Sequence, residues 1–214
     1  MKQIAYNITK RIPKIEYIVI HDTGNPKKGA DAENHFRYFN GGNRDSSADF
    51  FVDDKQILQV NDYNKYYTWH CGDGKGKYGI TNSNSIGIEI CINPDGNYDV
   101  AFEKTIELTK KLMAELKISA DRVVRHYDAS RKNCPASMND GQWSKWHEFK
   151  KRIEAKDMSK LTDINGHYAQ AHIEKLEKYG IVNGDGQGKF NPDDKATRAD
   201  VAIMIANALN VIGK

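Results

Sequence analysis

Short apolar segments alternate with polar turns over the first half of the chain. Residues 15–20 are rich in branched and aromatic side chains and end at His21, which predicts a buried strand. Residues 48–52 and 56–60 predict a hairpin, and residues 85–93 predict a further strand. Because ligand sites gather at the carboxyl ends of sheet strands, His21 stands where chemistry is expected.

In other stretches the apolar residues are spaced as in a helix. In residues 99–117 apolar side chains recur every three or four positions with Glu and Lys between them, which predicts an amphipathic helix. Residues 30–40 and 142–153 predict two more helices, and residues 123–126 predict a short strand that enters a loop. Together these elements predict an α/β domain in which helices flank a mixed central sheet.

The pattern changes at residues 154–160, which are charged and lack periodic apolar positions. We expect a linker here and therefore two domains, 1–156 and 157–214. In the second domain, residues 167–178 predict a helix stopped by a glycine. The Thr-x-x-Asp pattern at residues 197–200 resembles a capping box and predicts the start of another helix. A small helical module should thus follow the α/β domain.

Charge and composition exclude several classes of protein. A net charge of +3 is too small to indicate a nucleic-acid-binding protein, which needs a concentrated basic face. No apolar stretch is long enough to cross a bilayer, and residues 1–11 lack the apolar core of a signal peptide. We therefore expect a soluble protein made in the cytoplasm without a signal peptide, with neither nucleic acid nor membrane as a partner.

His126 and Cys134 bracket a short loop that ends at a proline. Zinc accepts both imidazole and thiolate ligands, although such a pair alone is more often part of the packing. His21 supplies a third ligand. Three protein ligands leave one coordination position open, as a catalytic zinc site requires.

Strand alternation in residues 85–93 places four isoleucines on one face and Glu89 and Asn93 on the other. A carboxylate in the middle of such a strand is costly to bury without a partner or a function, so Glu89 is a candidate general base. The alternative is a solvent-facing glutamate on a half-exposed strand. Lys132, two residues before Cys134, is a candidate to stabilise the negative charge formed in amide hydrolysis, or else an ordinary surface lysine.

Five sequence motifs surround these candidate residues. They are Val19-Ile-His21-Asp-Thr, Ser46-Ser-Ala-Asp-Phe-Phe-Val-Asp-Asp, Tyr67-Thr-Trp-His-Cys-Gly72, Ser85-Ile-Gly-Ile-Glu89, and Val124-Arg-His126-Tyr-Asp followed by Lys132-Asn-Cys-Pro135. In this order they resemble the type 2 N-acetylmuramoyl-L-alanine amidases. That family includes many phage endolysins and is related to the peptidoglycan recognition proteins. The resemblance extends from residue 1 to about residue 152.

The resemblance implies a Zn²⁺ site formed by His21, His126 and Cys134, with Glu89 and Lys132 as catalytic residues. It also implies the substrate, peptidoglycan, and the bond cut, the amide between the lactyl group of N-acetylmuramic acid and L-alanine. Together with the expected lack of a signal peptide, it implies a phage or prophage endolysin. Such a protein is made in the cytoplasm and acts at the bacterial cell wall.

The candidate substrate contacts are Trp69, His70 and Asn93. An aromatic plane can stack on the apolar face of a sugar, but a core tryptophan beside a capping histidine fits the sequence nearly as well. Many family members have a histidine where this chain has Asp49, so we expect the groove near the peptide stem to differ. His35, in the first predicted helix, should be structural or should support a ligand from behind, rather than be a ligand itself.

The tail resembles a single S-layer homology repeat. Its motifs are Leu161-Thr-Asp-Ile-Asn-Gly-His-Tyr168, a glycine-rich loop over residues 180–192, and Thr197-Arg-Ala-Asp200. The resemblance implies binding of a secondary cell-wall polymer, with Arg198 as the contact to an anionic sugar. Such domains normally have three repeats, and one repeat has difficulty covering its apolar faces, so we expect a homo-oligomer through the tail. A degenerate calcium loop at residues 183–194 is an alternative.

Two other functions remain open for the whole chain. A noncatalytic recognition protein would bind peptidoglycan without cutting it, but such relatives lack the cysteine ligand that is present here as Cys134. A cytosolic amidase that recycles wall fragments would fit the missing signal peptide, but it would not need a wall-binding tail. The sequence therefore favours the wall hydrolase.

Overall fold

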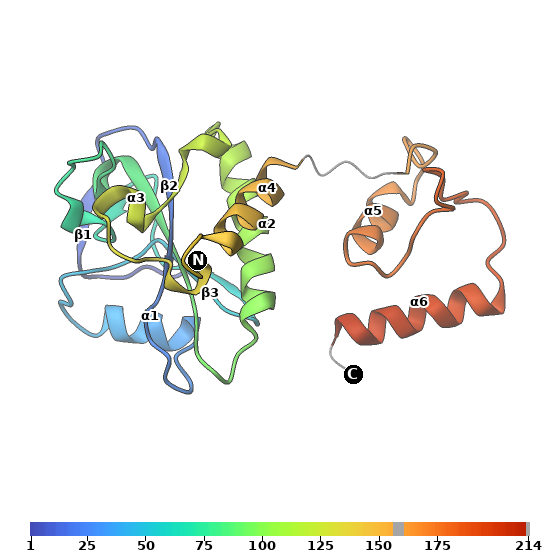
Figure 1. Ribbon diagram of the computed structural model, residues 1–214, viewed down its shortest axis with the longest axis horizontal. Coiled ribbons are helices and arrows are strands. Elements are labelled where there is room, and N and C mark those ends of the chain that lie inside the picture. Colours follow the sequence, from blue (N-terminus) through green and yellow to red (C-terminus); the bar gives the residue numbers. More distant parts are fainter. Residues whose placement is uncertain (156–160, 213–214) are drawn as a thin grey trace. The chain divides into compact units, whose positions relative to one another are not determined.

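The computed structural model describes residues 1–155 and 161–212 and divides into two compact units, Met1–Ala155 and Lys156–Lys214 (Figure 1). Of the linker expected at residues 154–160, Glu154 is instead the last residue of a helix, and residues 156–160 lie outside the described residues. Among those described, no helix combines the length and the apolar character needed to span a membrane.

A five-stranded mixed sheet forms the centre of the first unit, as the sequence predicts. The strand order is β4-β3-β6-β2-β7, and every neighbouring pair is parallel except β3 with β4. A separate antiparallel pair, β1 with β5, was not predicted. The strands are β1 (Ile8–Lys10), β2 (Tyr17–Asp22), β3 (Phe50–Val52), β4 (Ile57–Gln59), β5 (Tyr66–Thr68), β6 (Ser85–Ile90) and β7 (Val123–Arg125).

Helices cover this sheet. The long helix α2 is the one that the apolar spacing predicts, and the side chain of Asn97 caps its first turn by accepting from the N–H groups of Asp99 and Val100. The helix α3 was not predicted: a loop was expected after the strand at residues 123–126, but His126 is the first residue of a helix. The helices are α1 (Ala32–Asn40), α2 (Tyr98–Leu116), α3 (His126–Ser130) and α4 (Ser144–Glu154), with 3-10 helices η1 (Gly72–Gly74), η2 (Asn82–Asn84), η3 (Ala120–Arg122) and η4 (Ala136–Met138).

The two faces of the sheet bury different layers. On one face the isoleucines of β2 and β6 join the main core with residues of α2 and α4. On the other face Phe51 of β3 packs with α1, and its ring stacks on His35 with centroids 5.4 Å apart. In Figure 1, α2 and α4 lie on one side of β2 and α1 lies on the other. Because side chains alternate along a strand, His21 and Glu89 face away from the isoleucine core.

Asp49, the residue before β3, is fully buried. Its carboxylate accepts hydrogen bonds from the side chains of Asn61 and Thr68 and from the N–H of Gly87, at 2.7–2.8 Å. Burial raises the pKa of this carboxyl, whereas the three hydrogen bonds and the charge of Arg11 act in the opposite direction. Asp49 therefore connects β5 and β6 to the start of β3. Because its side chain has no exposed surface, Asp49 cannot itself contact a substrate, and the expected difference in the groove stays a prediction.

The described part of the tail contains two helices, α5 (Gln170–Lys178) and α6 (Arg198–Val211). The predicted capping box is present: the side chain of Thr197 accepts from the N–H of Asp200, and the carboxylate of Asp200 accepts from the N–H of Thr197. A small core joins the segment before α5 to that helix. Its buried residues are Leu161, Ile164 and Ile173, with Ala169 and Phe190 packed against them.

The helix α6 leaves its apolar side chains uncovered within the described part of this unit. None of its residues is buried. The exposed large apolar residues from this helix and the residue after it are Val201, Ile203, Ile205, Leu209, Val211 and Ile212. Self-association through the tail, expected because one repeat cannot cover its own apolar faces, stays a prediction.

We expect Asp49→Asn to lower the free energy of unfolding by roughly 1–3 kcal/mol. The amide of asparagine replaces one accepting oxygen by an NH₂ group, which would then face a buried hydrogen-bond donor without an acceptor between them. Urea denaturation followed by circular dichroism measures this change. Asp45→Asn is the control, since Asp45 is exposed and its positive φ of 54° also suits asparagine. Equal stability of Asp49→Asn and wild type would show that the buried carboxylate is not needed.

Candidate active site

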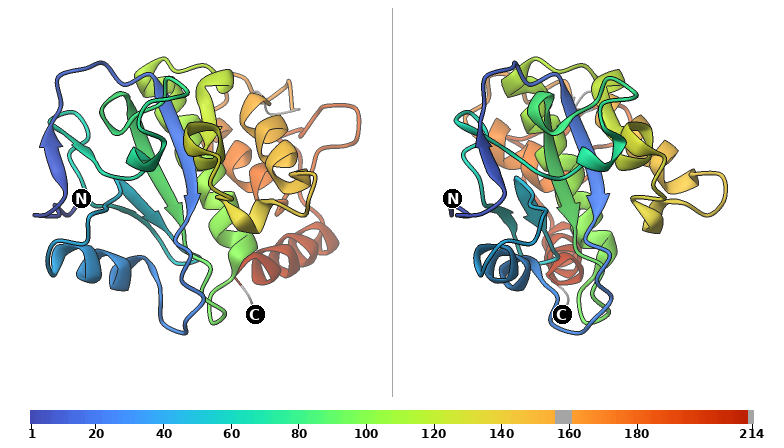
Figure 2. Two further views of the ribbon diagram at one scale, coloured as in Figure 1. Left: turned by 60° about the vertical axis from the view of Figure 1, so that its left-hand side comes forward. Right: turned by 90° about the vertical axis from the view of Figure 1, so that its left-hand side faces the viewer.

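Parallel strand pairing brings two candidate residues together. His21 lies near the end of β2 and Glu89 near the end of β6, and the register of the strands pairs these two residues directly. Figure 2 shows β2 (blue) and β6 (green) side by side. On the other side of β2, β7 leads directly into His126, the first residue of α3. The pairing of the strands therefore brings His21, Glu89 and His126 close together.

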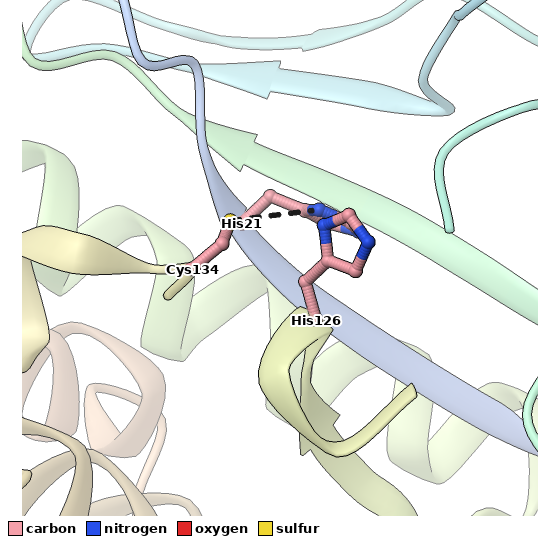
Figure 3. Close-up of side chains that lie close together, drawn as sticks. All are labelled: His21, His126 and Cys134. Carbon is pink, nitrogen blue, oxygen red and sulfur yellow. Dashed lines mark hydrogen bonds between the residues drawn. The ribbon is translucent and has the colours of Figure 1, made fainter. Parts of the chain in front are cut away.

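The side chains of His21, His126 and Cys134 converge (Figure 3). One potential ligand atom from each lies within 4.8 Å of the others, and the three residues are only 1, 3 and 6% exposed, respectively. The Sγ of Cys134 lies 3.9 Å from Nδ1 of His21, and the ring centroids of the two histidines are 4.6 Å apart. Cys134 comes from the loop after α3, where its carbonyl accepts from the N–H of Tyr127.

These three side chains fit a metal ion by their chemistry. Burial lowers the pKa of His21 and His126, so both rings are neutral and have a free lone pair at neutral pH. The Nδ1 of His126 is buried without a hydrogen-bond partner, which is rare unless the atom has another function. Burial raises the pKa of Cys134 to about 12, and a bound cation would release that proton. Two imidazoles and a thiolate suit a borderline-soft ion.

Glu89 lies beside this cluster. Its side chain is 17% exposed, and its Oε1 lies 3.8 Å from Nδ1 of His21. Its Oε2 is buried and has no hydrogen-bond partner. Burial raises the pKa of Glu89 to about 8, with a further increase from the charge of Asp22 and a decrease from that of Lys132. A carboxyl group with this pKa can both accept and donate a proton near neutral pH.

Lys132 lies in the exposed loop between α3 and Cys134. Its carbonyl accepts a hydrogen bond of 2.8 Å from the N–H of Cys134. Its positive charge lowers the pKa values of His21, His126 and Glu89, so its field acts across the cluster. A cation in this position can stabilise negative charge that develops on a substrate.

Trp69 borders an open cavity of about 330 Å³. Its side chain is 38% exposed, and its Nε1 donates to Oγ1 of Thr9 at 3.1 Å. Tyr67 and Lys75 also line this cavity. An aromatic plane at an open cavity can stack on a sugar, and the role of Trp69 as a substrate contact stays a prediction.

Asn93 and His70 make contacts within the protein. Asn93 is 9% exposed, and its side chain donates to the carboxylate of Asp95, which orders the turn after β6. His70 is buried; its Nδ1 lies 3.0 Å from Nε2 of His21, and its Nε2 lies 3.1 Å from Oγ of Ser85. Both ring nitrogens of His70 are therefore engaged. Substrate binding by Asn93 and His70 stays a prediction.

Asp73 is a site residue that no motif reveals. Its Oδ1 lies 2.7 Å from Nε2 of His126, although the two residues are 53 positions apart in the chain. The only sequence signal is that Asp73 directly follows the motif that ends at Gly72. A polar residue there is too common to indicate a contact with a candidate ligand.

Comparison with known proteins gives two family matches. Residues 11–137 match the family model described as N-acetylmuramoyl-L-alanine amidase, and residues 160–202 match the S-layer homology domain. The N-acetylmuramoyl-L-alanine amidase CwlH of Bacillus subtilis (strain 168) is 40% identical over 141 residues, which cover 66% of this chain and 54% of CwlH. XlyA, an amidase of the same strain, is 42% identical over 137 residues, 64% of this chain and 43% of XlyA. The chain spans about half the length of these curated relatives.

Solved structures agree with the first match. The catalytic domain of XlyA has a TM-score of 0.61 at 41% identity and covers 69% of this chain and 91% of that domain. A mutant endolysin from Bacillus subtilis has a TM-score of 0.62 at 40% identity, and the match covers 72% of this chain and 99% of the endolysin chain. The first unit thus has the predicted type 2 amidase fold. The family model for N-acetylmuramoyl-L-alanine amidases also matches more than half of the chain, and the chain therefore belongs to the N-acetylmuramoyl-L-alanine amidase family.

Proposed function

We propose that the first unit is a zinc-dependent peptidoglycan hydrolase, which cleaves the amide bond between N-acetylmuramic acid and the L-alanine of the stem peptide. The observation that carries this proposal is the convergence of His21, His126 and Cys134 beside Glu89. Membership of the amidase family supports the bond that is cut. Two neutral imidazoles and a thiolate support zinc as the metal, because zinc binds both ligand types with one position left open.

The chain's own residues would carry the proton transfers. Zinc, when bound, lowers the pKa of water and polarises the amide carbonyl. Glu89 accepts a proton from the attacking water and passes it to the leaving amine, because it lies beside His21 with a buried oxygen that has no hydrogen-bond partner. Although burial raises the pKa of Glu89, the charge of Lys132 lowers it and so favours the ionised form that a base needs. Lys132 stabilises the negative charge on the oxygen of the former carbonyl. No covalent bond to the protein is needed.

A biological role as an endolysin fits this chemistry, and the similarity to an endolysin from Bacillus subtilis supports it. A recognition protein that binds without cutting is the less favoured function, because Cys134 completes the ligand set. A wall-recycling amidase is also less favoured, because the match to an S-layer homology domain suggests attachment to the wall. The site of action would then be the bacterial cell wall.

The second unit would hold the enzyme on the wall. We assign it to binding of a secondary cell-wall polymer, with Arg198 as a contact for an anionic sugar. Arg198 is exposed and is the first residue of α6. The position of Arg198 in the S-layer homology match supports this role.

Zinc content and the bond cut test the main proposal. We expect purified protein to contain stoichiometric zinc and to release fragments with a new N-terminal L-alanine from peptidoglycan, detected by mass spectrometry. Cys134→Ser should lose both the metal and the lytic activity, because a hydroxyl is a poor substitute for a thiolate ligand. Cys91→Ser, at a buried thiol outside the site, is the matched control. A Cys134→Ser enzyme that keeps zinc and full activity would contradict the proposal.

Glu89→Gln should retain zinc and lose turnover by about 10²–10⁴-fold, because an amide cannot accept the proton from water. Metal analysis and the rate of release of L-alanine-terminated peptides measure the two effects separately. Glu148→Gln on α4 is the control for removal of a negative charge. An active Glu89→Gln enzyme would remove Glu89 from the mechanism.

Arg198→Ala should weaken binding to isolated cell walls while leaving hydrolysis of soluble peptidoglycan fragments unchanged. Sedimentation of the full chain with walls measures the bound fraction. Lys195→Ala removes a neighbouring exposed positive charge and serves as the control. Equal binding by Arg198→Ala and wild type would exclude Arg198 as a polymer contact.

A further inference from the structure

Both candidate metal-binding histidines contact the same short segment of chain, residues 70–73, which follows β5 and includes the first two residues of η1. The Nε2 of His21 lies 3.0 Å from Nδ1 of His70. The Nε2 of His126 lies 2.7 Å from a carboxylate oxygen of Asp73. Each imidazole therefore uses Nε2 for a contact with this segment and leaves Nδ1 for the metal-binding cluster.

The contact with Asp73 determines the tautomer of His126. An ionised carboxylate only accepts hydrogen bonds, so the Nε2 of His126 must carry the proton and donate it. A neutral imidazole carries a proton on only one of its two nitrogens, so the Nδ1 of His126 is unprotonated and has a free lone pair. This Nδ1 is the buried atom without a hydrogen-bond partner. The Asp73 carboxylate thus leaves His126 in the form that a metal ion requires.

A chain of hydrogen bonds gives His21 the same tautomer. The hydroxyl of Ser85 donates to the carbonyl of Thr81, so its oxygen accepts from Nε2–H of His70. The Nδ1 of His70 then has no proton and accepts from Nε2–H of His21. As a result, Nδ1 of His21 is unprotonated, and it faces Sγ of Cys134 at 3.9 Å.

The surrounding structure holds this segment in place. The side-chain oxygen of Asn82 accepts from the N–H of His70 at 3.0 Å and from the N–H of Cys71 at 2.7 Å. The ring of His70 lies directly over Gly87, where an added Cβ would come within 2.6 Å of its Cγ. Gly74, next to the segment, approaches the carbonyl of Ala129 in α3 so closely that a Cβ would lie 2.0 Å from that oxygen. Close packing therefore fixes the segment against β6 and α3.

We propose that residues 70–73 act as a positioning segment that fixes His21 and His126 as Nε2–H tautomers and directs both Nδ1 atoms at the metal. His70 and Asp73 are its two positioning residues, and neither binds the metal. This inference rests on the zinc site proposed above. It reassigns His70 from the substrate groove to the support of a metal ligand.

Zinc affinity of the full chain, measured by competition with a chromogenic chelator, is the first test. His70→Ala and Asp73→Ala should each weaken zinc binding by about 10–100-fold. Asp73→Asn, which keeps an accepting oxygen, should lose less than Asp73→Ala. His35→Ala removes a buried imidazole that stacks on Phe51 and is not part of the metal-binding cluster, so it controls for general destabilisation. Asp73 is 47% exposed, so its variants should fold even where His70→Ala does not.

Nitrogen NMR of histidine-labelled, metal-free protein is the second test, because imidazole shifts distinguish the two tautomers. In the wild type both His21 and His126 should be Nε2–H. His70→Ala should alter the tautomer population of His21 alone, and Asp73→Ala that of His126 alone. A protonated Nδ1 on either ring in the wild type would overturn the inference.

The outcomes separate this inference from the zinc proposal. A wild-type chain that binds no zinc would remove the metal site itself. A wild type that binds zinc, with unchanged affinity and unchanged tautomers in Asp73→Ala, would leave the metal site standing and refute the positioning role. Weakened affinity together with the residue-specific tautomer change supports it.

Discussion

The parallel register of β2 between β6 and β7 is the constraint on which the site depends. It pairs His21 with Glu89 directly and delivers His126 at the end of the neighbouring strand. The same alternation that packs isoleucines of β2 and β6 into the main core turns His21 and Glu89 to the opposite face. A shift of one residue in either strand would move its polar side chain into the isoleucine layer, so the stability of the core also maintains the geometry of the site.

Much of this arrangement follows from the sequence because it depends on strong local patterns. The isoleucine alternation around Glu89 and the helical spacing of residues 99–117 identify a strand and a helix, and the motifs identify the three candidate ligands. The strands β1 and β5 have three residues each, too few for a periodic pattern to be visible. The contact between Asp73 and His126 joins residues 53 positions apart, and only the folded chain reveals it.

Two buried carboxylates show how structural and functional roles differ in the same sheet. Asp49 accepts three hydrogen bonds from neighbouring segments, so its buried oxygens are satisfied. Glu89 has one buried oxygen without a partner and lies next to His21. Burial raises the pKa of both groups. The pKa direction therefore does not distinguish the two groups, whereas the unsatisfied oxygen at the cluster is what supports the catalytic role proposed for Glu89.

The two units of the chain carry different proposed roles. The three candidate ligand side chains, Glu89, and the proposed positioning residues of segment 70–73 all belong to the first unit, and so do the hydrogen bonds of His21 with His70 and of His126 with Asp73. In its described part, the second unit has a small core cluster of Leu161, Ile164 and Ile173 and a helix α6 whose large apolar residues are mostly exposed. A unit with so small a core has little buried apolar surface to stabilise its fold, so self-association through this unit stays a prediction. Its contribution is therefore expected in binding and association, while the geometry of the candidate active site depends on the sheet of the first unit.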